Sequence, residues 1–341
     1  MDNRLMKTIT ELCLINGISG DESKVAGYIT DAIKDYCETV SIDKTGNVIA
    51  FKKGLKRREK KLMVAAHMDE VGFIVTSITD SGMLKFKAVG GVYEREVLGK
   101  RVVVGEDVSG VVAYTPIHLS KGAEREEIPS YDTLYIDIGA KTKEEAENAV
   151  NIADSVSFIT EPELFGDGLI KAKALDDRIG CGIMIELIKS ELLYDTWFVF
   201  TTQEEVGLRG ARVASYTVEP DACIVIEGTT AADLTFVEDD KKVCYLKKGA
   251  VISFMDKSTI YDKGLYQLCM KIARENDIRI QAKQVVAGGN DSGAIHLSKG
   301  GVRTLAVSVP CRYLHGPSTT AAVEDIMAVK ALVSEMINRS V

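Results

Sequence analysis

Residues 197–207 read WFVFTTQEEVG, an apolar run that is followed by two adjacent carboxylates and a glycine. Aromatic and β-branched residues over 197–201 are typical of a buried strand. Because adjacent side chains on an extended segment point in opposite directions, we expect Glu204 and Glu205 to have different roles. One can hold a cation while the other faces a substrate as a base. The simpler alternative is a solvated strand-to-helix turn, since isolated carboxylates are mostly exposed.

The composition of the 341-residue chain excludes several classes of protein. Its formal net charge of −8 argues against binding to nucleic acid or to an anionic membrane surface. No apolar run approaches the ~18 residues of a membrane-spanning helix, and the N-terminus lacks a signal-peptide core. The seven cysteines are scattered without a C-x-x-C pair, which predicts a cytoplasmic protein and argues against a cysteine-based zinc site. Any metal would then be bound by carboxylates and by the four histidines.

An alternation of strands and helices occupies both ends of the chain, and it predicts an α/β domain made of residues 1–69 and 161–341. Apolar periodicity predicts helices over 5–15, 261–275 and 321–339, and two more that carry Val25, Ile29 and Ile33, and Ile179, Ile183 and Leu187. Strands are expected over 40–42, 47–51, 61–66, 169–174, 197–201, 222–226 and 304–309.

The segment over 70–160 has a different texture, because short β runs follow one another there with glycines and polar turns between them. The runs cover 71–78, 83–88, 101–104, 110–114, 133–138 and 155–159. Only one helix is expected, opened by Thr142 and Glu145 as a capping box. This pattern predicts a small all-β domain, a barrel or a sandwich, inserted into the α/β chain.

Side chains that can bind metal follow five of the apolar strands: His67, Asp176, Glu204-Glu205, Glu227 and His315. Each alone has an ordinary explanation, such as a core histidine, a helix N-cap or a solvated glutamate. Those explanations do not account for their common place at strand ends, where open α/β sheets bind their ligands. Imidazoles and carboxylates without thiolates suit zinc, cobalt or manganese. The set exceeds the needs of one tetrahedral ion, so we expect two ions that share a bridging carboxylate.

The order of these motifs resembles the M42 family of dinuclear metallo-aminopeptidases, which includes the tetrahedral and the glutamyl aminopeptidases. The matching stretches are His67-x-Asp69, ALDDRIG at 174–180, EEVG at 204–207, EGTT at 227–230, GGNDSGAIHL at 288–297 and PCRYLHGP at 310–317. The resemblance covers essentially the whole chain, including the position of the β insertion. It implies a mixed-sheet α/β/α, zinc-peptidase-like catalytic domain, and an inserted domain that mediates dimerisation. It also implies a homo-oligomer in which dimers assemble into a dodecamer.

The resemblance further implies a role for each site residue. Asp176 bridges two divalent ions, zinc or cobalt and less commonly manganese; His67 and Glu227 complete one site, and Glu205 and His315 complete the other. Glu204 is the general base, and Asp69 orients His67 through its second ring nitrogen. An activated water then hydrolyses N-terminal residues from peptide substrates. Glu227 stands where many members of the family carry Asp, and Asp291 is open to two interpretations, as a pocket residue or a turn residue.

Two other classes of function stay open. A metal-independent glycosidase, of the endoglucanase type, would use Glu204 with another carboxylate as an acid/base pair and would tolerate a chelator. A non-catalytic binding protein would have no need of the base. A serine hydrolase is disfavoured because the chain has no G-x-S-x-G elbow. The sequence does not predict which N-terminal residue is preferred.

Overall fold

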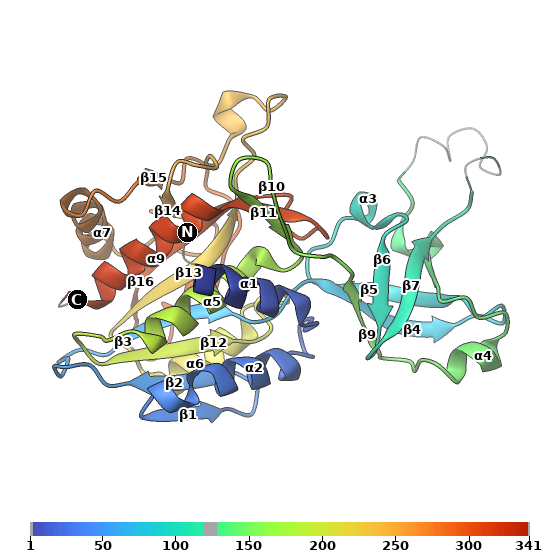
Figure 1. Ribbon diagram of the computed structural model, residues 1–341, viewed down its shortest axis with the longest axis horizontal. Helices are drawn as coiled ribbons and strands as arrows, with labels where there is room; N and C mark the ends of the chain where they lie inside the picture. The colour runs from blue at the N-terminus through green and yellow to red at the C-terminus, as the bar shows by residue number, and fades with distance from the viewer. Residues whose placement is uncertain (1–2, 117, 119–127, 340–341) are drawn as a thin grey trace.

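The computed structural model describes residues 3–116, 118 and 128–339, which form two bodies side by side (Figure 1). The larger body is an α/β structure that contains both ends of the chain. The smaller body is a closed β barrel, and the chain enters it after β3 and leaves it after β9. The predicted α/β fold with a small inserted all-β unit is therefore confirmed, and the unit is a barrel and not a sandwich.

An 11-stranded mixed sheet runs through the larger body of the described chain. Its main order is β1 (Thr39–Ile42), β2 (Val48–Lys52), β12 (Thr196–Thr201), β3 (Leu62–His67), β13 (Ala222–Thr230), β16 (Arg303–Arg312), β17 (Thr319–Ala322), β11 (Leu169–Ala172) and β10 (Glu163–Phe165). Strand β14 (Ala250–Ile252) also pairs with β16 and with β15 (Ile280–Ala282).

The strand directions bring five carboxyl ends to one edge of this sheet. Strands β12 and β13 pair with β3 in parallel, and β16 pairs with β13 in parallel. Strand β17 is antiparallel to both β16 and β11, so β11 runs in the same direction as the central four. Side chains that follow β3, β11, β12, β13 and β16 can consequently meet in one place.

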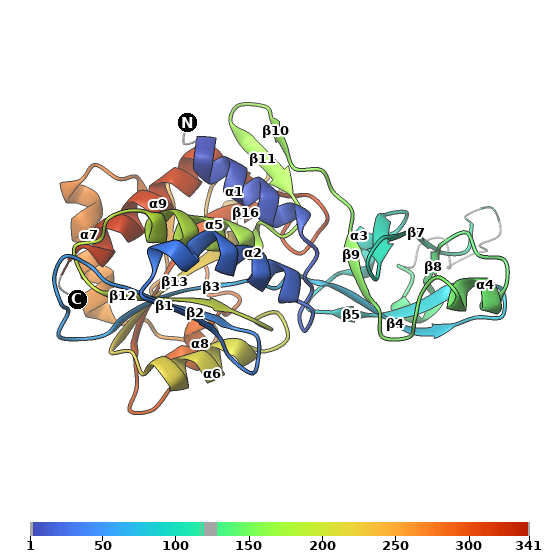
Figure 2. The same ribbon diagram turned by 60° about the horizontal axis from the view of Figure 1, so that its bottom comes forward.

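Helices cover both faces of the sheet, as Figure 2 shows. One face packs against α1 (Asn3–Leu14), α2 (Ser23–Ile33), α5 (Leu175–Lys189), α7 (Lys263–Glu275) and α9 (Val323–Ile337), and the other packs against α6 (Arg209–Val218) and α8 (Ser292–Ile295). Strand β3 shows why its apolar run is continuous: Val64 and Ala66 join the first core, while Met63 and Ala65 join the second. None of the described helices combines the length and apolarity needed to cross a bilayer.

The barrel has the closed order β4 (Gly72–Ile78), β5 (Leu84–Val89), β8 (Tyr135–Asp137), β7 (Val108–Ala113), β6 (Arg101–Val104) and β9 (Ser155–Phe158). Its core is aromatic, with the ring of Phe73 edge-on to Phe86 and Phe158 at centroid distances of 5.1 and 5.3 Å. The predicted helix is α4 (Lys143–Glu147), whose first turn is capped by the Thr142 hydroxyl, which accepts a hydrogen bond from the Glu145 N–H.

Several elements differ from the sequence prediction. A second short helix, α3 (Glu94–Val97), lies in the barrel unit, and α6 and β10 were not anticipated. The last helix begins at Val323 and not at 321, because Thr319–Ala322 forms β17 between β11 and β16. All four residues of β17 are buried. The small residues of Thr319–Ala322 adjoin a helical pattern, so the sequence alone assigns part of them to the helix. Their pairing with β11 and β16 makes the segment a strand.

Candidate metal centre

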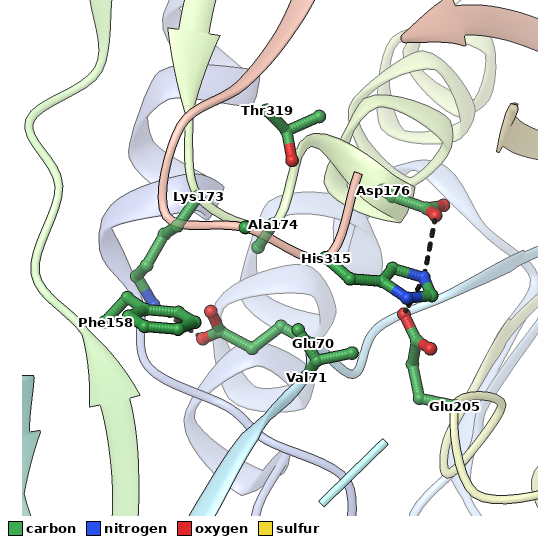
Figure 3. Close-up of a pocket in the computed structure, with 10 residues that line it drawn as sticks. Glu70, Val71, Phe158, Lys173, Ala174, Asp176, Glu205, His315 and Thr319 are labelled. Carbon is green, nitrogen blue, oxygen red and sulfur yellow. Dashed lines mark hydrogen bonds and ion pairs between the residues drawn. The ribbon is translucent and has the colours of Figure 1, made fainter. Parts of the chain in front are cut away.

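Five predicted ligands converge at the carboxyl edge of the sheet. The Nε2 atom of His67 lies 3.4 Å from Asp176 Oδ1 and 3.4 Å from Glu227 Oε1. The Nε2 atom of His315 lies 3.3 Å from Glu205 Oε1 and 3.8 Å from Asp176 Oδ2 (Figure 3). The two histidines thus face different oxygens of the same carboxylate, and each has a glutamate of its own beside it.

The expectation that each of these residues ends a strand is correct only for His67. Asp176 lies in the first turn of α5, and His315 lies in the loop between β16 and β17. Glu227 lies inside β13, which extends beyond it because the pairing with β16 continues to Thr230. The side chains still meet because the strands run in the same direction, although most of these residues lie a few positions away from the end of a strand.

The adjacent glutamates are not on an extended segment, which corrects the opening expectation. They lie in the loop after β12, where Gln203 has a φ of 54° and a turn follows. The carboxylate of Asp69 holds this loop, since Oδ1 accepts the Glu204 N–H at 3.0 Å and Oδ2 accepts the Glu205 N–H at 3.2 Å. Asp69 therefore positions both glutamates through their backbone, a role that the sequence did not indicate.

The imidazole of His67 is oriented by the main chain more than by a carboxylate. Its Nδ1 lies 3.0 Å from the carbonyl oxygen of Asp69 and 3.5 Å from Asp69 Oδ1. An Nδ1–H that donates to the carbonyl leaves the lone pair of Nε2 directed at Asp176 and Glu227. The residue predicted to orient this ring lies beside it, and its carbonyl oxygen makes a shorter contact than its carboxylate does.

His315 is oriented from the barrel. Its Nδ1 lies 3.1 Å from the carbonyl oxygen of Gly91, which fixes the ring with Nε2 toward Glu205 and Asp176. A Cβ atom at Gly91 would lie only 3.2 Å from that Nδ1, so a side chain there would have to displace the ring by a few tenths of an ångström. No motif in the sequence marks Gly91, because the contact joins residues 224 positions apart.

Burial and crowding shift the titration of the carboxylates. Burial raises the pKa of Glu204 and Glu227 well above the ordinary value for a glutamate, and it raises the pKa of Glu205 to about 7. Burial also opposes ionisation of Asp176, but contact with His67 and its charge hold the pKa of Asp176 below the usual range. A cation at this place would relieve the repulsion among these groups.

A buried nitrogen without a hydrogen bond also indicates that these residues can bind a metal ion. The Nε2 atom of His67 is buried and makes no hydrogen bond within the described part of the chain, although two carboxylates lie 3.4 Å away. Two sets, His67 with Asp176 and Glu205, and His67 with Asp177 and Glu227, each have donor atoms within 4.8 Å of one another. Asp177 was not among the predicted ligands, and adjacency to Asp176 was its only signal.

Glu204 lies beside this centre without belonging to either set. It lines a cavity of about 460 Å³ together with Asp176, Glu205, Glu227 and His315. The charges of His67, Asp291, Glu205 and Asp69 act on its carboxyl group. Asp291 is buried and accepts the Thr201 hydroxyl at 2.5 Å, and burial raises its pKa to about 6, so it is a buried acid near Glu204 and not an exposed turn residue.

A buried cation supports the residues that follow β3. The guanidinium of Arg178 is fully buried; its Nε donates to the Met68 carbonyl at 2.7 Å, and its NH1 donates to the carbonyls of Leu12 at 2.6 Å and Ile15 at 3.1 Å. Lys173 and Glu70 form an ion pair of 2.6 Å beside it (Figure 3). This cluster joins the end of α1, the end of β3 and the start of α5.

Replacing Arg178 by Met is expected to lower the free energy of unfolding by roughly 3–5 kcal/mol, because buried carbonyls lose their donor and Glu70 keeps only Lys173 as a cationic neighbour. Urea denaturation of the purified variant measures the change. Arg212→Met, at an exposed position of α6, is the matched control and is expected to stay within about 0.5 kcal/mol of the parent protein. Equal stabilities of the two variants would contradict the role given to Arg178.

Comparison with known proteins agrees with this geometry. Residues 46–332 match the family model described as M42 glutamyl aminopeptidase. A protein of Acetivibrio thermocellus that carries a provisional aminopeptidase name is 41% identical, with 94% of each chain covered. The lysyl aminopeptidase of Pyrococcus furiosus is 32% identical with 98% of each chain covered, and the glutamyl aminopeptidase of Lactococcus lactis is 31% identical with 97% of this chain and 94% of that protein covered.

Solved structures share the whole fold. A TET aminopeptidase from the archaeon Thaumarchaeota archaeon SCGC AB-539-E09 superposes with a TM-score of 0.94 at 32% identity, covering 99% of this chain and 96% of that one. A dodecamer of PhTET1-12s gives 0.86 at 34% identity, covering 97% and 98%. A protein of Thermotoga maritima described as an endoglucanase gives 0.81 at 34%, covering 97% and 96%. This chain belongs to the M42 family of peptidases and is a hydrolase of the aminopeptidase type.

Proposed function

We propose that this chain is a metal-dependent aminopeptidase that removes N-terminal residues from peptides, using water activated by two divalent ions and Glu204 as the general base. The observation that carries the proposal is the position of Asp176 between His67 and His315, each of which faces a different carboxylate oxygen. A carboxylate placed in this way suits a bridge between two ions. A glycosidase would need two carboxyl groups set apart around a sugar and would not need two imidazoles beside them.

The residues divide into two sets around this bridge. His67 and Glu227 would hold one ion, with the carboxylate of Asp177 close by. Glu205 and His315 would hold the other. Zinc or cobalt suits this mixture of nitrogen and oxygen donors, with manganese as a third choice. When bound, the ions supply Lewis acidity, which lowers the pKa of water and stabilises negative charge on the carbonyl oxygen of the substrate.

Glu204 is suited to take up and return a proton. Burial and the neighbouring carboxylates raise its pKa, so the carboxylate has a stronger tendency to accept a proton than an exposed glutamate has. Its main chain is fixed by Asp69, which keeps the side chain in the cavity wall. The protonated acid can then deliver its proton to the leaving amine.

The charge of the cavity favours a free N-terminus. Of the four carboxylates that line it, Glu204 lies outside the two candidate ligand sets, so its charge is available to attract the cationic α-amine of a peptide. A volume of about 460 Å³ is in the range of sites for small ligands and is suited to the end of a chain. These features support release of single residues from the N-terminus.

Assembly and location belong to the same proposal. The related PhTET1-12s structure is a dodecamer, which supports a homo-oligomer in which the barrel units over 70–160 pair subunits into dimers. The barrel exposes apolar side chains at Val111 and Tyr114, as an interface requires. All seven cysteines are free, which supports a location in the reducing cytoplasm.

Removal of metal tests the proposed chemistry. Dialysis against a chelator is expected to abolish hydrolysis of aminoacyl-p-nitroanilides, and addition of two equivalents of zinc or cobalt per chain is expected to restore it. Hydrolysis of a soluble β-glucan is measured in parallel on the same samples. Glucan hydrolysis that survives the chelator, with no peptidase activity in the metal-loaded protein, would support the glycosidase alternative and overturn the proposal.

A further inference from the structure

The loop over 202–205, which carries the proposed base, is held by side chains from three other parts of the chain. Asn47 accepts the backbone N–H of residue 202 at 2.9 Å, and Glu22 accepts that of residue 203 at 3.0 Å. The two oxygens of Asp69 accept the next two N–H groups. Loops usually lie at the surface, where water can satisfy their backbone groups, so four consecutive side-chain acceptors fix this loop within the fold.

The carbonyl groups of the loop are engaged as well. Those of residues 202–204 accept N–H groups, at 2.9 to 3.2 Å, from the turn that follows and from the start of α6: Gly207, Leu208, Arg209 and Gly210. A Cβ atom at Gly210 would lie 2.3 Å from Asn47 Oδ1 and 2.4 Å from the carbonyl oxygen of residue 202. The loop is packed so closely between Asn47 and α6 that a shift of its backbone breaks hydrogen bonds.

Gln203 has an uncommon backbone conformation directly before the base. Its φ of 54° lies in the left-handed region, where the Cβ atom of an L-residue crowds the following carbonyl oxygen. A residue other than glycine keeps such a conformation only where the surrounding structure determines it. The hydrogen bond from its N–H to Glu22 is a contact of this kind, because it joins residues 181 positions apart. Glu22 thus sets the direction in which the chain continues into Glu204.

Glu22 is placed for this contact by a turn that also supports Asp69. The side chain of Glu22 is 6% exposed, and its Oε1 accepts the Gly20 N–H at 2.9 Å in addition to the N–H of the loop. In the same turn, the hydroxyl of Ser19 donates at 2.6 Å to Asp69 Oδ2, which is one of the two oxygens that bond to the loop. Residues 19–22 therefore hold the loop at two points, directly through Glu22 and indirectly through Asp69.

The geometry requires an acceptor at Glu22 and not a charge. The groups that act on its carboxyl group are main-chain N–H groups and the like charge of Asp69. An amide oxygen in the same position would accept the same hydrogen bonds. Glu22 is not among the described residues that line the cavity of about 460 Å³ beside the candidate metal centre. It can therefore act on the reaction only through the loop.

We propose that Glu22 is a positioning residue for the proposed base: it holds Gln203 in the left-handed conformation and so keeps the carboxylate of Glu204 in the wall of that cavity. The inference rests on the proposed function, in which Glu204 moves the proton. A shift of a reacting group by about 1 Å can lower a rate about 100-fold, so one such contact is sufficient to control kcat. The N–H of Glu205 stays bonded to Asp69, so we expect metal binding to persist without Glu22.

Two substitutions at Glu22 separate the acceptor from the charge. Glu22→Met removes both, whereas Glu22→Gln removes only the charge. With zinc- or cobalt-loaded protein and an aminoacyl-p-nitroanilide, we expect kcat to fall roughly 10–100-fold in Glu22→Met and less than about threefold in Glu22→Gln, with KM and the number of bound ions unchanged in both. Glu22→Asp keeps the charge but withdraws the acceptor by one methylene, and it gives the same contrast if Glu22→Met does not fold. Glu38→Met, at an exposed position, is the matched control and leaves kcat unchanged.

Combination with Glu204→Gln shows whether Glu22 acts through the base. We expect Glu22→Met to change kcat by less than about twofold in the Glu204→Gln background, because no base is left there to position. A general structural role would give the same fold loss in both backgrounds. Equal losses in the two backgrounds would overturn the inference, and so would a Glu22→Gln variant as slow as Glu22→Met or a loss of ions from Glu22→Met.

Hydrogen–deuterium exchange measured by mass spectrometry tests the same contact without turnover. The peptide that contains residues 202–208 is expected to exchange faster in Glu22→Met than in Glu22→Gln, because the N–H of Gln203 has lost its acceptor. Equal exchange in the two variants would overturn the inference. Parent-level kcat in Glu204→Gln would overturn the proposed base and this inference with it. A large loss in Glu204→Gln beside parent-level kcat in Glu22→Met would overturn the inference alone and leave the aminopeptidase proposal intact.

Discussion

Replacing Glu204 by Gln is expected to lower kcat for an aminoacyl-p-nitroanilide by roughly 10²–10⁴-fold, the range for loss of a positioned general base. The amide has nearly the shape of the carboxylate, but it cannot accept a proton from water. The backbone hydrogen bond to Asp69 involves the N–H of residue 204 and survives the change. Because Glu204 is outside both candidate ligand sets, we expect the variant to bind two ions per chain, as the parent protein does.

Steady-state kinetics and elemental analysis on the same samples measure both halves of this prediction. Glu219→Gln, an exposed carboxylate at the end of α6 that pairs with Lys299, is the control for loss of a glutamate charge. It is expected to keep full activity. Parent-level kcat in Glu204→Gln would show that another group removes the proton, whereas loss of metal from this variant would place Glu204 among the ligands.

The sequence was sufficient for the parts of the fold that depend on local pattern. The apolar runs at β3 and β12 predicted buried strands, and the cores on both faces of the sheet explain why those runs do not alternate. The site followed from one further step: parallel strands bring their carboxyl ends together, so His67, Glu227 and His315 could be expected to meet although they are far apart in the chain.

The remaining features depend on contacts between distant segments, which no local pattern records. The carbonyl of Gly91 reaches His315 from the barrel, and the carboxylate of Asp69 accepts the N–H groups of two glutamates. Arg178 looked like one more charged residue after the two aspartates, yet it is fully buried against the backbone carbonyls of Leu12 in α1 and of Met68, which follows β3. His315, Asp69 and Arg178 are polar side chains whose hydrogen-bond partners are backbone N–H or carbonyl groups. Every residue type except proline carries both groups, so the sequence does not show which residues supply these partners.

Asp176→Asn is expected to have the second large effect, a loss of both ions and a fall in kcat of at least about 10³-fold, because it removes the shared negative ligand. The amide keeps the volume of the side chain and its carbonyl can still accept the Gly228 N–H, which lies 3.2 Å from Asp176 Oδ1. What it lacks is the charge that both histidines face. His315→Ala removes a ligand from one side only and is expected to keep about one ion per chain.

The contrast between these variants tests the bridge itself. Metal content is measured after equilibration with a small excess of zinc, and thermal melting of the metal-free proteins shows whether each variant is folded. Asp167→Asn, an exposed carboxylate paired with Lys247, is the matched control and should bind as many ions as the parent protein. If Asp176→Asn kept one ion as His315→Ala does, Asp176 would serve a single ion, and the two histidines would belong to sites that share no ligand.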